Sequence, residues 1–298
     1  MADIKLFNIN GKVTELQSGN VTLEKELQTV IENNMETFFG VTFLASEYKT
    51  TDGGRMDSIG IDENHCPVIF EYKRSMKENV INQGLFYLNW LLDHKDSFKV
   101  LVIEKLGLKE ADKIDWTMPR VVCIAGDFTK YDESAIKQMN RNVSLIRYKK
   151  FGSDLLMFEH INENVATAIP DTDTPTTKAK SADKTFDEQL KTADTSVKTL
   201  YQDLTNYVLS LGDDVSETHL KLYAAFKKIR NIVTVVALKK KLILNLPLDV
   251  NSVTFEEGFS RDVTNIGYWG CGAVELHVQN AADFEKAKPL IDRAYNEN

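Results

Sequence analysis

Cysteine and histidine are scarce in this chain, and their spacing excludes two common kinds of scaffold. The three cysteines, Cys66, Cys123 and Cys271, lie far apart and form no CxxC pair. An odd and scattered set argues against a disulfide framework and is typical of free thiols in a reducing cytoplasm. The five histidines include no pair at zinc-ligand spacing, so we expect no structural zinc site.

Long apolar runs are also missing. No run approaches the ~20 residues that a membrane-spanning helix needs. The first residues, MADIKLFNINGKV, lack the charged and then apolar segments of a secretion signal. We therefore expect a soluble, cytoplasmic protein without membrane contact.

Positive charge is in short supply. The chain has 36 Lys and Arg against 44 Asp and Glu, which gives a net charge of −8. An acidic protein binds nucleic acid only where its basic residues gather locally, in one cleft or stripe. The net charge thus argues against bulk attraction to nucleic acid, and it leaves a local site open.

One segment has the composition of a linker. Residues 166–184, ATAIPDTDTPTTKAKSADK, contain almost no large apolar side chain and are rich in Thr, Ala, Asp, Lys and Pro. A chain of 298 residues is long enough for about two domains of roughly 100–200 residues each. We expect domains at 1–165 and 185–298, joined by this flexible linker.

The first part has the pattern of an α/β domain with a mixed central sheet flanked by helices. A hairpin is expected around Asn10-Gly11, the pair that type I′ turns prefer. The other expected elements are helices at 23–39, 78–94 and 131–140, and strands at 55–61, 67–73, 100–104, 121–125, 143–148 and 154–159.

The second part is predicted to be a small α+β domain. Its expected elements are helices at 186–211, 216–230 and 282–295, and strands at 232–238, 241–248 and 273–278. A glycine-rich loop carries Gly267, Gly270 and Gly272 beside Arg261, Tyr268 and Trp269. These residues could either approach a ligand closely or form a tight turn with an aromatic plug.

A group of charged residues lies on two expected strands of the first part. Asp57 precedes Glu71 by fourteen residues, and Lys73 follows two residues later. Side chains alternate along a strand, so Glu71 and Lys73 share a face, and the turn at 62–65 can fold Asp57 alongside them. Two carboxylates and a lysine suit a hard divalent cation and a positioned water, which is the chemistry of phosphodiester hydrolysis.

This Asp-x13-Glu-x-Lys pattern, between two helices, resembles the PD-(D/E)XK nuclease superfamily over residues 20–160, in its RecB-like and archaeal endonuclease-like branch. Met56 stands where the name-giving proline would be. The resemblance implies a restriction-endonuclease-like core that binds Mg²⁺ or Mn²⁺ through Asp57, Glu71 and the backbone carbonyl of Tyr72. It assigns Lys73 to orienting the attacking water.

The same resemblance implies further site residues. A first-helix glutamate would join the metal or its water, with Glu24 the best match, Glu26 its competitor and Glu47 a third choice. Gln83 and Tyr87 match the Gln-x3-Tyr of the RecB-like branch and share one helix face. Apart from the resemblance, Arg55, Arg74 and Lys77 lie near these residues in the sequence; they could contact backbone phosphates, of DNA or else of RNA, or be ordinary surface charges.

One alternative for the first part remains open, and the second part has a resemblance of its own. The first part could be a non-catalytic module that retained the nuclease fold, binds nucleic acid or protein, and belongs to a defence or repair complex. The second part, in residues 222–246, residues 261–278 and a closing helix with Ile291 and Tyr295, resembles an uncharacterised domain family found alone or behind nuclease-like domains. We expect this second part to mediate the formation of a homodimer or to bind a protein partner.

Overall fold

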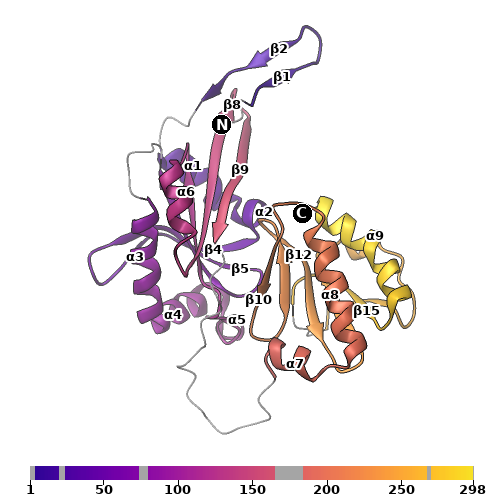
Figure 1. Cartoon of the computed structure of the whole chain (residues 1–298). Coiled ribbons are helices and arrows are strands. Elements are labelled where there is room, and N and C mark those ends of the chain that lie inside the picture. The colour runs from indigo at the N-terminus through magenta and orange to yellow at the C-terminus, as the bar shows by residue number, and fades with distance from the viewer. Residues whose placement is uncertain (1–3, 20–23, 74–79, 165–183, 267–269, 298) are drawn as a thin grey trace. The chain divides into compact units, whose positions relative to one another are not determined.

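The computed structural model describes residues 4–19, 24–73, 80–164, 184–266 and 270–297 (Figure 1). The chain divides into two compact units, residues 1–114 with 118–167, and residues 115–117 with 168–298. The linker expected at 166–184 lies outside the described residues except for Lys184, and so do Arg74, Lys77, Gly267, Tyr268 and Trp269. Within the described ranges, no helix is long and apolar enough to cross a membrane.

The first unit is built on a seven-stranded mixed sheet with the order β3-β8-β7-β6-β5-β4, and β9 pairs with β8. Strands β4, β5 and β6 are antiparallel, β6, β7 and β8 are parallel, and β9 is antiparallel to β8. The strands are β3 (Ser18–Gly19), β4 (Val41–Lys49), β5 (Arg55–Asp62), β6 (Pro67–Lys73), β7 (Arg120–Ala125), β8 (Asn142–Phe151) and β9 (Leu155–Asn164).

Helices cover both faces of this sheet, which confirms the predicted α/β class. A Cβ on Gly84 of α3 would lie 2.4 Å from Val121 Cγ1, so α3 packs closely on the face of β7 that carries Val121. Cys123 of β7 and its neighbour Glu71 on β6 lie on the same face of the sheet. Helix α1 contacts the opposite face. The helices are α1 (Glu24–Asn33), α2 (Met35–Phe39), α3 (Val80–Asp93), α4 (Lys95–Leu106), α5 (Leu108–Ala111) and α6 (Lys130–Ile136).

The N-terminal hairpin is confirmed as β1 (Leu6–Asn8) paired with β2 (Thr14–Leu16), but its turn is longer than expected. Asn8 pairs with Thr14, so residues 9–13 form the loop instead of a two-residue turn at Asn10-Gly11. The helix expected at 23–39 is also interrupted, because α1 ends at Asn33 and α2 begins at Met35.

One further prediction for the first unit was wrong, and one strand was not predicted at all. The strand expected at 100–104 is part of helix α4, where Leu101 and Val102 are buried while Val100 is 53% exposed. A helix that is apolar on several sides shows no 3.6-residue period, so its sequence resembles a buried strand. Strand β4 was not predicted, because a bulge near Phe43 and the left-handed backbone of Glu47 (φ 56°) break its alternation.

The second unit is a six-stranded antiparallel sheet with the order β10-β11-β12-β13-β15-β14. Three helices cover one sheet face and form a core with Phe186, Leu204, Phe226, Leu244 and Ile291. The elements are α7 (Phe186–Thr192), α8 (Thr195–Leu209), β10 (Ser216–His219), β11 (Ala224–Lys227), β12 (Asn231–Ala237), β13 (Leu242–Leu246), a 3₁₀ turn (Val250–Ser252), β14 (Ser260–Asp262), β15 (Val274–Val278) and α9 (Ala281–Glu297).

The α+β prediction for this unit is confirmed, but the helix expected at 216–230 was wrong. That segment forms the hairpin of β10 and β11. Ala224, Ala225 and Phe226 are all fully buried, so the strand has no polar face, and alanine favours helix on propensity alone. The single helix expected at 186–211 is two helices, separated at Ala193 and Asp194.

The described part of the glycine-rich loop packs on its own sheet. Gly270 (φ 111°) and Gly272 (φ 106°) have left-handed backbones. A Cβ there would meet Thr234 Oγ1 and the Leu246 backbone carbon, each at 2.2 Å. Arg261 pairs with the buried Glu275 at 2.6 Å. These glycines therefore serve close backbone packing.

Candidate active site at the open end of a strand pair

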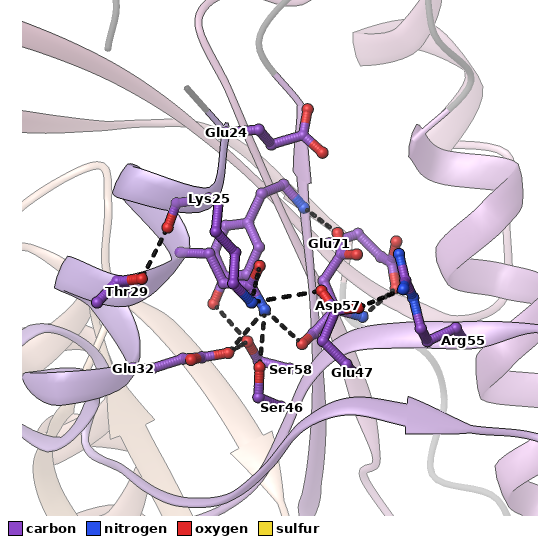
Figure 2. Close-up of polar contacts among 12 residues, drawn as sticks. Glu24, Lys25, Thr29, Glu32, Ser46, Glu47, Arg55, Asp57, Ser58 and Glu71 are labelled. Atoms are coloured by element: carbon purple, nitrogen blue, oxygen red, sulfur yellow. Dashed lines mark hydrogen bonds and ion pairs between the residues drawn. The ribbon is translucent and has the colours of Figure 1, made fainter. Parts of the chain in front are cut away.

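The backbone ladder between β5 and β6 stops at the Ser58–Phe70 pair. Beyond that pair, two backbone N–H groups donate to side-chain carboxylates, where a continued ladder would have them donate to backbone carbonyls. The Asp57 N–H donates to Glu71 Oε1 at 3.3 Å, and the Tyr72 N–H donates to Asp57 Oδ2 at 3.0 Å. The end of the strand pair thus brings Asp57 and Glu71 together, as Figure 2 shows.

Glu71 lies in a place that disfavours its charged form. Its side chain is fully buried, and among the described residues its Oε2 has no hydrogen-bond partner. Burial, and then the neighbouring carboxylate of Asp57, raise the pKa of Glu71 to about 9. Burial also raises the pKa of Asp57, although the Tyr72 N–H and Lys73 oppose this. A cation at this position would relieve the repulsion between the two carboxylates.

Lys73 lies at the end of β6, on the same strand as Glu71. Its side chain is 10% exposed, and its Nζ is 3.5 Å from Oε1 of Glu24, the first residue of α1. The competing glutamate, Glu26, instead pairs with Lys150 at 3.1 Å. Of the two first-helix candidates, Glu24 is the one that contacts the predicted site.

Glu47 and Arg55 form an ion pair beside Asp57. Arg55 Nη1 lies 2.5 Å from Glu47 Oε2, and the Arg55 side chain is 58% exposed. Glu47 is close enough to Asp57 to contribute to its raised pKa, after the causes given above. Exposed pairs of this kind contribute little stability, so a phosphate could replace Glu47 as the partner of Arg55.

Gln83 and Tyr87 of α3 contact the start of β5. The hydroxyl of Tyr87 accepts a hydrogen bond from the Arg55 N–H at 3.1 Å and one from Gln83 Nε2 at 3.3 Å. Tyr87 is buried. Through these contacts the pair holds the strand two residues before Asp57.

A polar cluster that the sequence pattern did not predict lies on the opposite face of the same strands. Gln28 and Glu32 of α1 reach Ser46 and Ser58, and Figure 2 shows Glu32, Ser46 and Ser58 gathered there. A signal was available in the sequence. Glu24, Gln28 and Glu32 recur every four residues beside the buried Leu27 and Ile31, so polar side chains line the inward face of the helix.

The oxygen ligands available here fit a hard divalent cation. Among the described residues, no group of three or more His, Cys, Asp and Glu side chains is arranged to hold a metal. Mg²⁺ commonly takes only one or two carboxylates and keeps several waters. Asp57, Glu71 and the Tyr72 carbonyl supply oxygen atoms only, and the buried Oε2 of Glu71 is a carboxylate oxygen in need of a partner.

Comparisons with known proteins give one match to the second part of the chain and one to nearly all of it. A family described as "Domain of unknown function (DUF5655)" matches residues 186–298. A Haemophilus influenzae protein described as "Uncharacterized protein" is 28% identical over 300 residues, which cover 95% of this chain and 96% of its own.

Two solved structures match about half of the chain. A repair endonuclease from Pyrococcus abyssi gives a TM-score of 0.25 and 18% identity, over 45% of this chain and 50% of its own. A chain of an "EndoMS-dsDNA2 complex" gives a TM-score of 0.26 and 15% identity, over 48% of this chain and 64% of its own. In both cases the match spans less than two thirds of the solved chain.

Proposed function

We propose that the first unit is a divalent-metal-dependent nuclease that hydrolyses phosphodiester bonds in nucleic acid, with DNA as the first substrate to test and RNA as the second. The observation that supports this proposal best is the open end of the β5–β6 pair. There the buried Glu71 has a carboxylate oxygen without a hydrogen-bond partner among the described residues, it lies beside Asp57, and Lys73 is on the same strand. Burying two adjacent carboxylates costs stability, and a bound cation would offset that cost.

In this proposal Asp57, Glu71 and the backbone carbonyl of Tyr72 hold Mg²⁺ or Mn²⁺. When bound, the ion supplies positive charge that stabilises the developing charge on the phosphate and makes a bound water more acidic. This set of ligands has the size and the oxygen chemistry that Mg²⁺ prefers.

Lys73 and Glu24 act on the attacking water. The ammonium of Lys73, held 3.5 Å from the Glu24 carboxylate, orients the water and offsets negative charge on the phosphate. The water oxygen forms a bond to phosphorus as the P–O ester bond opposite it breaks. The half-exposed Glu24 carboxylate accepts the water proton.

Basic residues around the site contact the nucleic-acid backbone. Arg55 exchanges Glu47 for a phosphate, as a guanidinium can do with two parallel hydrogen bonds. Arg74 and Lys77 follow Lys73 by one and four residues in the sequence and are proposed to add two further phosphate contacts. Such a local cluster reconciles phosphate binding with a net charge of −8.

The test uses the full chain with plasmid DNA, single-stranded DNA and RNA, each with Mg²⁺, with Mn²⁺ and with EDTA. We expect metal-dependent cleavage that falls at least about 100-fold in Lys73→Met. Lys99→Met is the matched control, because Lys99 of α4 pairs with Asp112, the residue after α5, and lies outside the site. Binding without cleavage under every metal condition would contradict the proposal and favour a non-catalytic module.

A further inference from the structure

A buried polar network joins α1 to the strands that carry the two carboxylates. The side-chain amide of Gln28 is 4% exposed. Its Nε2 donates to the Asp57 carbonyl oxygen at 2.8 Å and to Glu32 Oε1 at 2.8 Å, and it lies 3.1 Å from Ser46 Oγ. A residue of the first helix thus holds the peptide unit of a proposed metal ligand.

The network continues to β6 through two hydroxyls. The Tyr72 hydroxyl donates to Ser58 Oγ at 3.1 Å, and the Ser58 hydroxyl donates to Glu32 Oε1 at 2.7 Å. Ser58 and Tyr72 are fully buried. Each hydroxyl proton has one acceptor in this chain of hydrogen bonds, so the network favours a single arrangement of the two strands.

This network lies where the strands lack their usual restraint. The β5–β6 ladder ends at Ser58 and Phe70, so no backbone pair of these strands sets their spacing at Asp57 and Tyr72. On one face of the sheet, the Asp57 carboxylate accepts a hydrogen bond from the Tyr72 N–H. On the other, Gln28 holds the Asp57 carbonyl, and Ser58 holds the Tyr72 side chain. The same two residues are therefore held from both faces of the sheet.

We propose that Gln28, Ser58 and the hydroxyl of Tyr72 are positioning residues for the metal ligands. They hold Asp57 and the Glu71–Tyr72 segment at the spacing that a shared Mg²⁺ or Mn²⁺ ion requires, and Glu32 is the common acceptor that orders them. This inference rests on the proposed function. None of these side-chain groups binds the ion itself, and the role of the Tyr72 hydroxyl is distinct from that of its backbone carbonyl.

Two substitutions in the full chain test the inference. Gln28→Met keeps the length of the side chain but cannot donate, and Tyr72→Phe removes only the hydroxyl. Thr29→Val is the matched control on the same helix, because the exposed Thr29 hydroxyl donates to the Lys25 carbonyl at 2.8 Å, outside the network. Ser58→Ala is a third variant for use if either substitution prevents folding, because it removes the hydroxyl that links Tyr72 to Glu32.

Two measurements separate positioning from general stability. Amide hydrogen exchange of the metal-free protein reports on the Asp57 and Tyr72 N–H groups relative to core amides of β7. Calorimetric titration with Mn²⁺ reports on the ligand set without requiring cleavage. We expect locally faster exchange at Asp57 and Tyr72 and about tenfold weaker Mn²⁺ binding in both variants, with Thr29→Val unchanged.

The outcomes distinguish this inference from the proposed function. Wild-type exchange and Mn²⁺ affinity in Gln28→Met and Tyr72→Phe would overturn the inference, and so would exchange that accelerates equally throughout the unit. If the wild type binds Mn²⁺ but cleaves nothing, the proposed nuclease activity fails and the positioning role stands. If the wild type binds no Mn²⁺, both the metal site and the purpose assigned to the network are refuted.

Discussion

Replacing Glu71 by glutamine is expected to stabilise the metal-free protein. Burial and the neighbouring Asp57 raise the pKa of Glu71 from its ordinary 4.5 to about 9. At pH 7 the unfolded chain has an ionised Glu71, whereas the folded chain keeps it protonated. The difference spans roughly 2.5 pH units at about 1.36 kcal/mol each, so the site costs about 3 kcal/mol of folding free energy at pH 7.

The sign of the pH dependence follows from proton binding. Between pH 4.5 and about 9 the folded state binds more protons at Glu71 than the unfolded state does. The stability associated with this group is therefore fully present below pH 4.5 and is lost as the pH rises toward 9. Glutamine is neutral throughout, and its side-chain oxygen can still accept the hydrogen bond from the Asp57 N–H.

The assay is thermal unfolding in EDTA at pH 5, 7 and 8.5. Glu71→Gln should raise the melting temperature at pH 7 by roughly 6–12 °C, with a smaller gain at pH 5. Glu104→Gln, an exposed carboxylate on α4, is the matched control and should change little. A Glu71→Gln protein that is less stable at pH 7, with the pH dependence of the wild type, would refute the reasoning.

Three further predictions concern metal, boundary and charge. In thermal-shift measurements, Mn²⁺ should raise the melting temperature of the wild type more at pH 8 than at pH 6, because the carboxylates must lose their protons to bind it. Asp57→Asn should abolish this rise in melting temperature. Limited proteolysis should cut first within 166–184, and both halves should stay folded by circular dichroism; first cuts within 20–160 would contradict the proposed boundary. Arg55→Ala and Arg74→Ala should each flatten the log–log salt dependence of DNA binding by about one unit, measured with Ca²⁺ in place of Mg²⁺; unchanged slopes would exclude these phosphate contacts.

The sequence was most informative where structure is set by neighbours along the chain. Strands β5 and β6 were predicted nearly to their ends, because apolar residues flank a short polar turn. Strand β7 and helix α9 were also found close to their bounds. A compact hairpin pairs residues close in sequence, so its strands can be deduced from a local pattern.

Prediction failed where burial on several sides removed the pattern. Helix α4 presents apolar side chains both to the core and to solvent, and β11 is covered on both faces. In each case the periodicity that distinguishes helix from strand is absent. The choice is then made by contacts with elements distant in sequence, such as the pairing of β11 with β12.

The candidate site shows the same division. The fourteen-residue spacing predicts that Asp57 and Glu71 meet across a hairpin, because the strand period and the turn length set the register, and the Asp57 N–H does donate to Glu71 Oε1. Only the tertiary structure decides that Glu24 and not Glu26 contacts Lys73, that Gln28 holds the Asp57 carbonyl, and that burial raises the pKa of Glu71. Those outcomes depend on how α1 and α3 pack on the two sheet faces, and packing depends on many residues far apart in the chain.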